Sequence, residues 1–194
     1  MAFPTSIGAG IFSDIAIATP IAPLTAPPAN EAAWKALFAT EAANVGGVAA
    51  AGAFVRIQNV REYPAIGTPA NIVNVPVYGA PNSSQVQGQS DAPDLSLTLN
   101  YVASDWAPAG TLLGPMVGDG VQRAFRFALL NAKPTATTTA QYASTAPGLG
   151  TVPNAQFYWM GKLEALVVNP QLTDANQATL TLTIQGAFAG AYTI

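Results

Sequence analysis

Residues 95–101 read LSLTLNY, a stretch in which apolar and polar side chains alternate strictly. A period of two is typical of a β-strand that buries one face and exposes the other. Residues 179–185, TLTLTIQ, repeat this alternation near the end of the chain. The two stretches together predict a mainly β fold.

Four further stretches favour strands, because they are rich in β-branched and aromatic side chains and are separated by turn-forming residues. They are residues 54–63, 72–78, 121–130 and 157–168. Pro76 indicates that the second is an edge strand or ends there, and Gly161 could interrupt the fourth. Residues 112–117 are expected to form a loop or a short helical turn before the turn signal Gly118-Asp119-Gly120.

Two connections, residues 79–91 and 134–153, are long and neutral. Loops of more than ~12 residues without structure of their own usually carry function or contact other molecules. In the first connection, glutamines occupy alternate positions: Gln85, Gln87 and Gln89. On a strand they would project from one face and form hydrogen bonds without charge. Two interpretations stay open, a solvated loop and a neutral contact with a neighbouring subunit.

One helix is predicted over residues 31–44. Asn30 is a favourable N-cap, and Glu31 stands in the first turn, where the helix dipole stabilises an acid. The apolar side chains recur at helical spacing and form one stripe: Trp34, Leu37, Phe38 and Val45. We expect Gly46-Gly47 to end the helix.

Residues 1–30 are rich in Pro, Ala and Ile, and the prolines are closely spaced between residues 20 and 28. Proline lacks an amide donor and has a fixed φ, so we expect neither a long helix nor a central strand here. The sequence therefore predicts two parts, an extended Pro-rich arm over residues 1–30 and a single β domain over residues 31–194.

The composition excludes most catalytic chemistry. The 194 residues include no cysteine and no histidine, so the chain has no disulfide, no thiolate nucleophile, no zinc–thiolate site and no Ser-His-Asp triad. Its 7 basic residues are too few for a surface that neutralises nucleic-acid phosphates. We predict that the protein is not an enzyme and holds neither a cofactor nor a metal.

The low charge points to self-association. Charged residues make up 9% of the chain, against roughly 25% in an average soluble protein, and the formal net charge is −3. We expect other subunits to cover much of the surface; a monomer with an exterior rich in Thr, Asn and Gln is the alternative. The start, MAFPTS, lacks a secretory pattern, and the small apolar run at 42–55 is too short to cross a bilayer, so a cytoplasmic origin without membrane contact is expected.

Two clusters could be mistaken for sites. Asp91 and Asp94 form a carboxylate pair, but no further ligands surround them, and we interpret them as turn residues that precede the strand at Leu95. Trp106 and the run at 157–160 could form a ligand platform. They lack convergent polar partners, so a place in the core or at a subunit interface is favoured.

Three segments together resemble the tail tube proteins of long-tailed bacteriophages. They are FVRIQNVREYPAIG at 54–67, VPVYGAPNSSQVQGQSDAPDLSLTLNYVASDW at 75–106 and GDGVQRAFRFALLNA at 118–132. The shared pattern is a strand, a long neutral loop, a Gly-Gln-x-Asp-Ala-Pro junction, an alternating strand that ends in Asn-Tyr, and a Gly-x-Gly turn into an Arg-Phe-Arg-Phe-type strand. The resemblance spans about residues 30–130.

This resemblance implies a β-sandwich or part-barrel with one flanking helix, which corresponds here to residues 31–44. Such subunits form hexameric rings that stack into a tube, with a continuous inner barrel through which double-stranded DNA leaves the virion. Type VI secretion tubes and contractile-phage inner tubes share the architecture. The implied partners are further copies of the chain and the tail terminator, tape measure and tail tip proteins. The implied location is the phage tail, assembled in the host cytoplasm.

Two groups of candidate residues follow. The loop at 79–92 and the N-terminal arm correspond to parts that bridge adjacent rings, which makes contact candidates of Gln85, Gln87, Gln89, Asp91 and Asp94. The polar faces of the two alternating stretches supply candidates for the lining of the lumen: Ser96, Thr98, Asn100, Thr179, Thr181, Thr183 and Gln185.

Three other classes of protein remain open as alternatives. A fimbrial or adhesive β-sandwich subunit would have a similar composition but needs export. A phage head-decoration protein would form trimers or pentamers on a shell, so oligomer symmetry separates it from a tube. A glycoside hydrolase would need two paired carboxylates flanked by aromatic side chains, and the scattered acids of this chain do not provide them.

Overall fold

The computed structural model describes residues 13–19, 24–46, 52–67, 72–79, 81–88, 94–129 and 155–193. Over these residues the protein is mainly β, with a nine-stranded mixed sheet, a two-stranded sheet and one short α-helix, α1 (Glu31–Ala36). The larger sheet contains β1 (Asp14–Ala18), β2 (Thr40–Glu41), β3 (Ala53–Ile57), β4 (Val60–Glu62), β7 (Leu95–Asn100), β8 (Arg123–Leu129), β9 (Ala155–Asn169), β10 (Gln177–Ile184) and β11 (Ala189–Thr193). The smaller sheet contains β5 (Ile72–Val75) and β6 (Ser84–Gln87).

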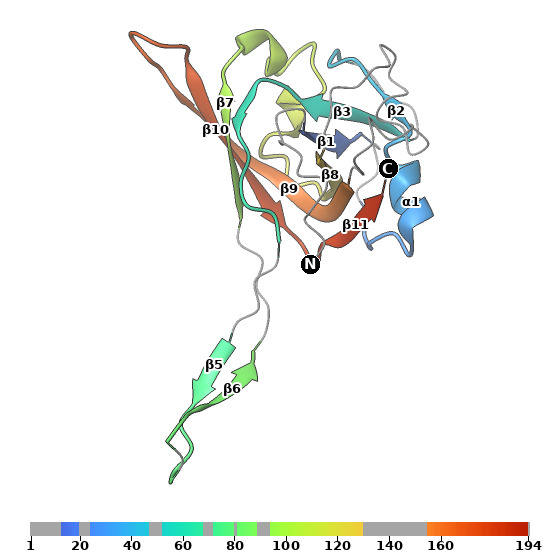
Figure 1. The fold of residues 1–194 in the computed structure, drawn as a ribbon. Helices are drawn as coiled ribbons and strands as arrows, with labels where there is room; N and C mark the ends of the chain where they lie inside the picture. Colours follow the sequence, from blue (N-terminus) through green and yellow to red (C-terminus); the bar gives the residue numbers. More distant parts are fainter. Residues whose placement is uncertain are drawn as a thin grey trace, which may run out of the picture.

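The larger sheet has the strand order β2-β3-β1-β8-β9-β10-β7-β4. β11 lies outside this order and pairs with the first part of β9. All pairs are antiparallel except that of β2 with β3. Figure 1 shows the large sheet wrapped around the centre of the body, with α1 on one side and the β5–β6 hairpin extending away from it.

Two features divide the sheet into two halves. The first part of β9 pairs with β8 and β11, whereas its second part pairs with β10. β3 and β4 are separated by a corner, Gln58 and Asn59, where Asn59 has a φ of 60°. Apolar side chains from both halves then meet in one core: Ile15, Ile17, Val55, Ile57, Leu95, Leu97, Leu99, Phe125, Trp159, Leu180 and Leu182 are among its members.

The two alternating stretches fold as expected. β7 and β10 pair with each other, and Leu97 lies opposite Leu180 while Thr98 lies opposite Thr179. The side chains that face the core are almost completely buried: Leu95, Leu97, Leu99, Ala178, Leu180 and Leu182. The strand predicted at 179–185 begins two residues earlier and ends at Ile184.

The prediction that residues 1–30 contain no central strand is wrong. β1 lies between β3 and β8, and all five of its residues are buried. The prolines between residues 20 and 28 follow this strand and leave its amides free to pair. Ile15 and Ile17 face the main core, whereas Ala16 and Ala18 face a second apolar cluster under α1. A strand that buries both faces shows little polar alternation, which is why the pattern did not reveal it.

The helix predicted over residues 31–44 is wrong in its length. Asn30 does cap α1, since its side chain accepts a hydrogen bond from the Ala33 amide at 2.9 Å. The helix ends at Ala36, and the amides of Ala39 and Thr40 then donate to the Gly52 carbonyl as the chain enters β2. Of the predicted apolar stripe, Trp34 in α1 and Phe38 directly after it are buried, whereas Val45 is 62% exposed.

The strands predicted at 72–78, 121–130 and 157–168 are confirmed with changed bounds as β5, β8 and β9. The strand expected at 54–63 is split by the Gln58–Asn59 corner, and the loop expected at 79–92 contains β6, which pairs with β5. Gly161 does not interrupt β9: a Cβ there would lie 2.0 Å from the Thr183 carbonyl oxygen, so the glycine allows β10 to approach. A short 3₁₀ turn at Gly114–Met116 confirms the expected turn. The connection at 134–153 lies outside the described residues.

Candidate assembly surfaces

The outer face of β7 and β10 is polar and neutral. Thr98 lies opposite Thr179, and Ser96 lies opposite Thr181. Among the lumen candidates, Ser96, Asn100 and Gln185 are exposed, and Thr98, Thr179, Thr181 and Thr183 are half-buried. None belongs to the apolar cluster under α1. The structure therefore brings these residues to one side of the second half-sheet, apart from Gln185, which follows the end of β10.

A few charges border this face. Glu62 on β4 lies opposite Thr98, and Lys162 on β9 lies opposite Thr183. Glu164 sits at a bulge in the pairing of β9 with β10, and its carboxylate is 3.5 Å from the Thr183 hydroxyl. The face therefore carries both signs of charge at its border and hydroxyl and amide groups in its middle.

Both borders of the second half-sheet are open. On the side away from β7, β4 has no strand partner within the described part of the chain. On the side away from β10, residues 162–169 of β9 likewise have none among the residues described; there the Leu163 carbonyl accepts a hydrogen bond from the Gly118 amide at 2.8 Å. Open strand edges carry unpaired N–H and C=O groups, which can pair with a strand of another chain.

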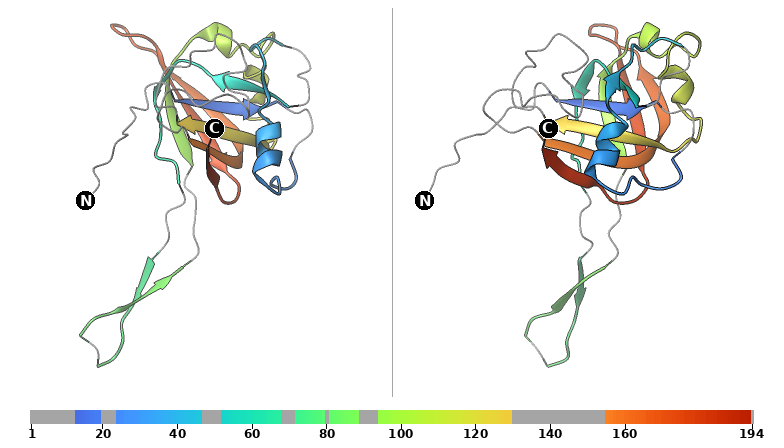
Figure 2. Two further views of the ribbon diagram at one scale, coloured as in Figure 1. Left: turned by 45° about the vertical axis from the view of Figure 1, so that its right-hand side comes forward. Right: turned by 90° about the vertical axis from the view of Figure 1, so that its right-hand side faces the viewer.

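The β5–β6 hairpin exposes apolar side chains on both faces. Among the strands that the structure describes, β5 and β6 pair only with each other. Figure 2 shows the hairpin extended away from the body in two further views. The exposed apolar side chains of residues 72–86 are Ile72, Val73, Val75, Val77, Tyr78 and Val86. An isolated two-stranded hairpin is marginally stable in water, and an exposed apolar surface of this kind marks an interaction site.

The contact candidates divide between this hairpin and its surroundings. Gln85 and Gln87 lie on β6, opposite Asn74 and Ile72, and both are exposed. Asp94 is exposed directly before β7. Gln89 and Asp91 lie outside the described residues.

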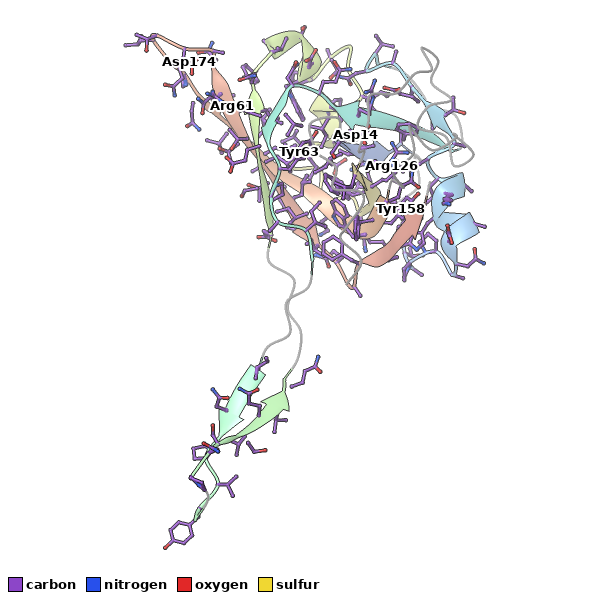
Figure 3. All side chains as sticks on the ribbon, viewed as in Figure 1. Asp14, Arg61, Tyr63, Arg126, Tyr158 and Asp174 are labelled. Atoms are coloured by element: carbon purple, nitrogen blue, oxygen red, sulfur yellow. The ribbon has the colours of Figure 1, made fainter. Side chains whose placement is uncertain are left out.

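A second projection is the β9–β10 connection. Leu172 at its end is fully exposed, and Arg61 approaches Asp174 at 3.5 Å. Figure 3 shows these two labelled residues at the same outer end of the body. Both side chains of this pair are partly exposed, so the pair contributes little to stability.

The sequence did not reveal a group of buried charges beside α1. Arg126 on β8 is completely buried, and its guanidinium lies 4.4 Å from the ring centre of Phe54 and 3.8 Å from the carboxylate of Asp14. Glu41 pairs with Arg56 nearby. Burial raises the pKa of Asp14 from 3.8 to about 6, although Arg126 and Arg56 act to lower it. The alternation in RAFRFAL could have indicated that Arg126 lies on the face opposite Phe125.

The suspected aromatic platform belongs to the core. Trp106, Tyr158, Trp159 and Met160 are buried, and the ring of Phe125 stacks on that of Trp159 with centres 5.5 Å apart. In the described ranges, no three Asp or Glu side chains come close enough to hold a metal ion. No helix in that part of the chain is long and apolar enough to cross a membrane.

A scan against models of known protein families finds no match, and no curated protein matches this sequence. Over the residues it describes, the structure defines a class directly: a mainly β protein with one short helix, a polar sheet face with open borders and a projecting apolar hairpin.

Proposed function

We propose that this protein is the subunit of a bacteriophage tail tube, and that hexameric rings of it stack into the conduit for DNA during ejection. The observation that carries the proposal is the second half-sheet. It consists of β4, β7, β10 and the second part of β9, and it has one leucine-rich buried face, one neutral polar face and two open borders. These are the properties that a segment of a closed barrel requires.

The dimensions agree with passage of DNA. If six copies each supply four strands, about 4.8 Å apart and tilted near 40°, the closed barrel has a backbone diameter of roughly 45–50 Å. About 5 Å of side chain on each wall leaves a lumen on the order of 35–40 Å. This is wider than a DNA duplex, and closure removes the open strand borders that would otherwise promote irregular aggregation.

The chemistry of the polar face suits a conduit. Lys and Arg side chains that faced the lumen would bind phosphates by counterion release, and six copies in each ring would multiply the effect. Ser96, Thr98, Thr179 and Thr181 supply hydroxyl groups without charge. At the border, Glu62 and Glu164 add negative charge and outnumber the positive charge of Lys162. DNA would therefore pass without being held.

The projecting hairpin has a role in the same assembly. Its exposed valines and isoleucine become buried when it contacts a neighbouring subunit. We assign to β5 and β6, together with the loop at 79–92, the contacts between rings. Residues 14–18 of the predicted arm have no part in them, because β1 is buried in the centre of the sheet. The fold is then the part-barrel of a tail tube protein with α1 as its flanking helix.

Electron microscopy of the purified protein at high concentration tests this function. Negatively stained hollow tubes with six-fold rings are expected. Trimers or pentamers would favour the second candidate, a head-decoration protein, and single particles at every concentration would refute self-assembly.

A hairpin variant tests the contact between rings. Replacement of residues 72–87 by a short Gly-Ser linker should leave the body folded, because β5 and β6 pair with no strand of the large sheet. The variant should no longer form long tubes. A control is Leu172→Ser, which removes a fully exposed apolar side chain from the other projection. Tubes of normal length from the hairpin variant would contradict this role.

A further inference from the structure

The two faces of the β5–β6 hairpin differ in chemistry. Val73 lies directly opposite Val86, so their side chains share one face, and Val75 is on that face because it is two residues along the strand. Asn74 and Gln85 lie opposite each other on the other face. We call the first the valine face (Val73, Val75 and Val86) and the second the amide face (Asn74, Gln85 and Gln87, with Ile72 beside Gln87). The three valines are 41–52% exposed.

The valine face requires an uncharged partner. Residues 72–88 contain no Asp, Glu, Lys or Arg, so the hairpin offers a partner apolar surface and hydrogen bonds but no ion pairs. The chain itself has surface of this kind. On the body, among the residues that the structure describes, the exposed large apolar side chains are Val45, Val102, Val167, Val168 and Leu172.

Two of these side chains form a candidate receiving surface. Val167 and Val168 lie on β9, whose open border is covered when the barrel closes, and Leu172 stands on the projecting β9–β10 connection. Val45 and Val102 remain, 62% and 39% exposed.

Hydrogen bonds place both valines at the 3₁₀ turn Ala103–Asp105. The Asp105 amide donates to the Val102 carbonyl at 3.0 Å, and the Asp105 carbonyl accepts from the side chain of Asn44, the neighbour of Val45, at 2.7 Å. We call Val45 and Val102 the receiving patch.

The valine face and the receiving patch lie at opposite ends of β7. The hairpin precedes Leu95, the first residue of β7, whereas Val102 follows Asn100, the last. The Tyr101 amide donates to the Asn176 carbonyl at 2.7 Å, which places that end of β7 beside the β9–β10 connection. In Figure 1 this connection points upward and the hairpin points downward. A strand of six residues is about 20 Å long, so the hairpin cannot cover the receiving patch of its own chain.

We infer that the valine face of one copy packs on the receiving patch of a second copy, so that the copies stack end to end in one orientation. The two surfaces are different, so the contact is heterologous, and a heterologous contact that displaces each copy along its strands continues as an open stack. This inference rests on the proposed tube function. It goes further because it assigns the contact to the valines, with Gln85 and Gln87 turned away, and because it names the surface that receives them.

Two variants with one cysteine each test this contact, since the chain has no cysteine of its own. Val86→Cys alters the valine face and Val102→Cys alters the receiving patch, and both parent side chains are exposed. If one variant carries a short tag, oxidation of the mixture should link one tagged to one untagged chain on a non-reducing gel. Each variant by itself should give at most a tenth of that product.

Gln85→Cys is the matched control, because Gln85 is the exposed neighbour of Val86 on the amide face. Mixed with Val102→Cys, it should give at most a third of the product that Val86→Cys gives.

Three results would overturn the inference. A linked product from Val86→Cys alone would mean that hairpins contact each other, and an equal yield from Gln85→Cys would contradict the choice of face. Wild-type tubes without any product from the mixed variants would refute the receiving patch and leave the tube function standing. A wild-type chain that never assembles contradicts the function itself.

Discussion

The buried Asp14 predicts an unusual dependence of stability on pH. Burial raises its pKa from 3.8 to about 6 in the folded protein, against the lowering effects of Arg126 on β8 and Arg56 on β3; Glu41 on β2 adds to the rise. The folded state therefore binds a proton more tightly than the unfolded state. Stability is lost when Asp14 ionises and is regained as the pH falls through about 6.

The magnitude follows from the two pKa values. A rise from 3.8 to about 6 corresponds to roughly 3 kcal/mol in full. Between pH 7.5 and pH 5 only part of it is regained, about 1 kcal/mol. Other groups interfere little in this range because the chain has no histidine. Asp119 titrates below it: partial burial raises its pKa, but hydrogen bonds from Arg123 and the Val121 amide bring it under 3.8.

Urea denaturation of the unassembled protein, followed by tryptophan fluorescence, measures this change. With a slope on the order of 2 kcal/mol per M, the midpoint should rise by about 0.5 M between pH 7.5 and pH 5. Asp14→Asn is the matched control, since it cannot ionise and its midpoint should stay constant over the same range. A wild-type midpoint that falls, or an equal rise in the Asn variant, would refute the assignment to Asp14.

Two substitutions test the sheet. Leu97→Ala removes most of a completely buried side chain and should lower the free energy of unfolding by about 2–5 kcal/mol. Its control, Ser96→Ala on the exposed face, should change the free energy of unfolding by less than about 0.5 kcal/mol. Equal losses of the two variants in thermal denaturation would contradict the burial pattern. Gly161→Ala places a Cβ 2.0 Å from the Thr183 carbonyl oxygen and should lower the melting temperature by several degrees or prevent folding. An unchanged melting temperature would show that β10 does not approach β9 so closely there.

Local patterns predicted much of the second half-sheet. The alternation at 95–101 shows which side chains of β7 are buried, and the similar stretch at 179–185 does the same for β10. Asn30 predicted the start of α1 because an N-cap depends on a hydrogen bond only three residues away. For the neutral glutamines at 85 and 87 the sequence leaves open a solvated loop and a contact with a neighbouring subunit, and the structure puts both on an exposed strand.

The errors arise where distant parts of the chain decide the outcome. β1 is central because β3 and β8 pair with it, and nothing near residues 14–18 specifies those partners. α1 stops at Ala36 because residues 39 and 40 bond to Gly52, which local helical spacing does not reveal. The burial of Arg126 depends on Phe54 of β3, Asp14 of β1 and Phe38 in the turn after α1, which lie far apart in the sequence.

By itself, the sequence determined the β character of this protein, the buried and solvent-facing sides of its two alternating strands, and the absence of thiol and imidazole chemistry. The tertiary structure alone decided that residues 14–18, a proline-free stretch within the predicted arm, enter the centre of the sheet. It also decided that the sheet divides at β9 and at the Gln58–Asn59 corner, and that a hairpin projects with its valines exposed. The physical reason is that a side-chain period reports only the environment on either side of one strand, whereas strand order and corners depend on hydrogen bonds and packing between residues far apart in the chain.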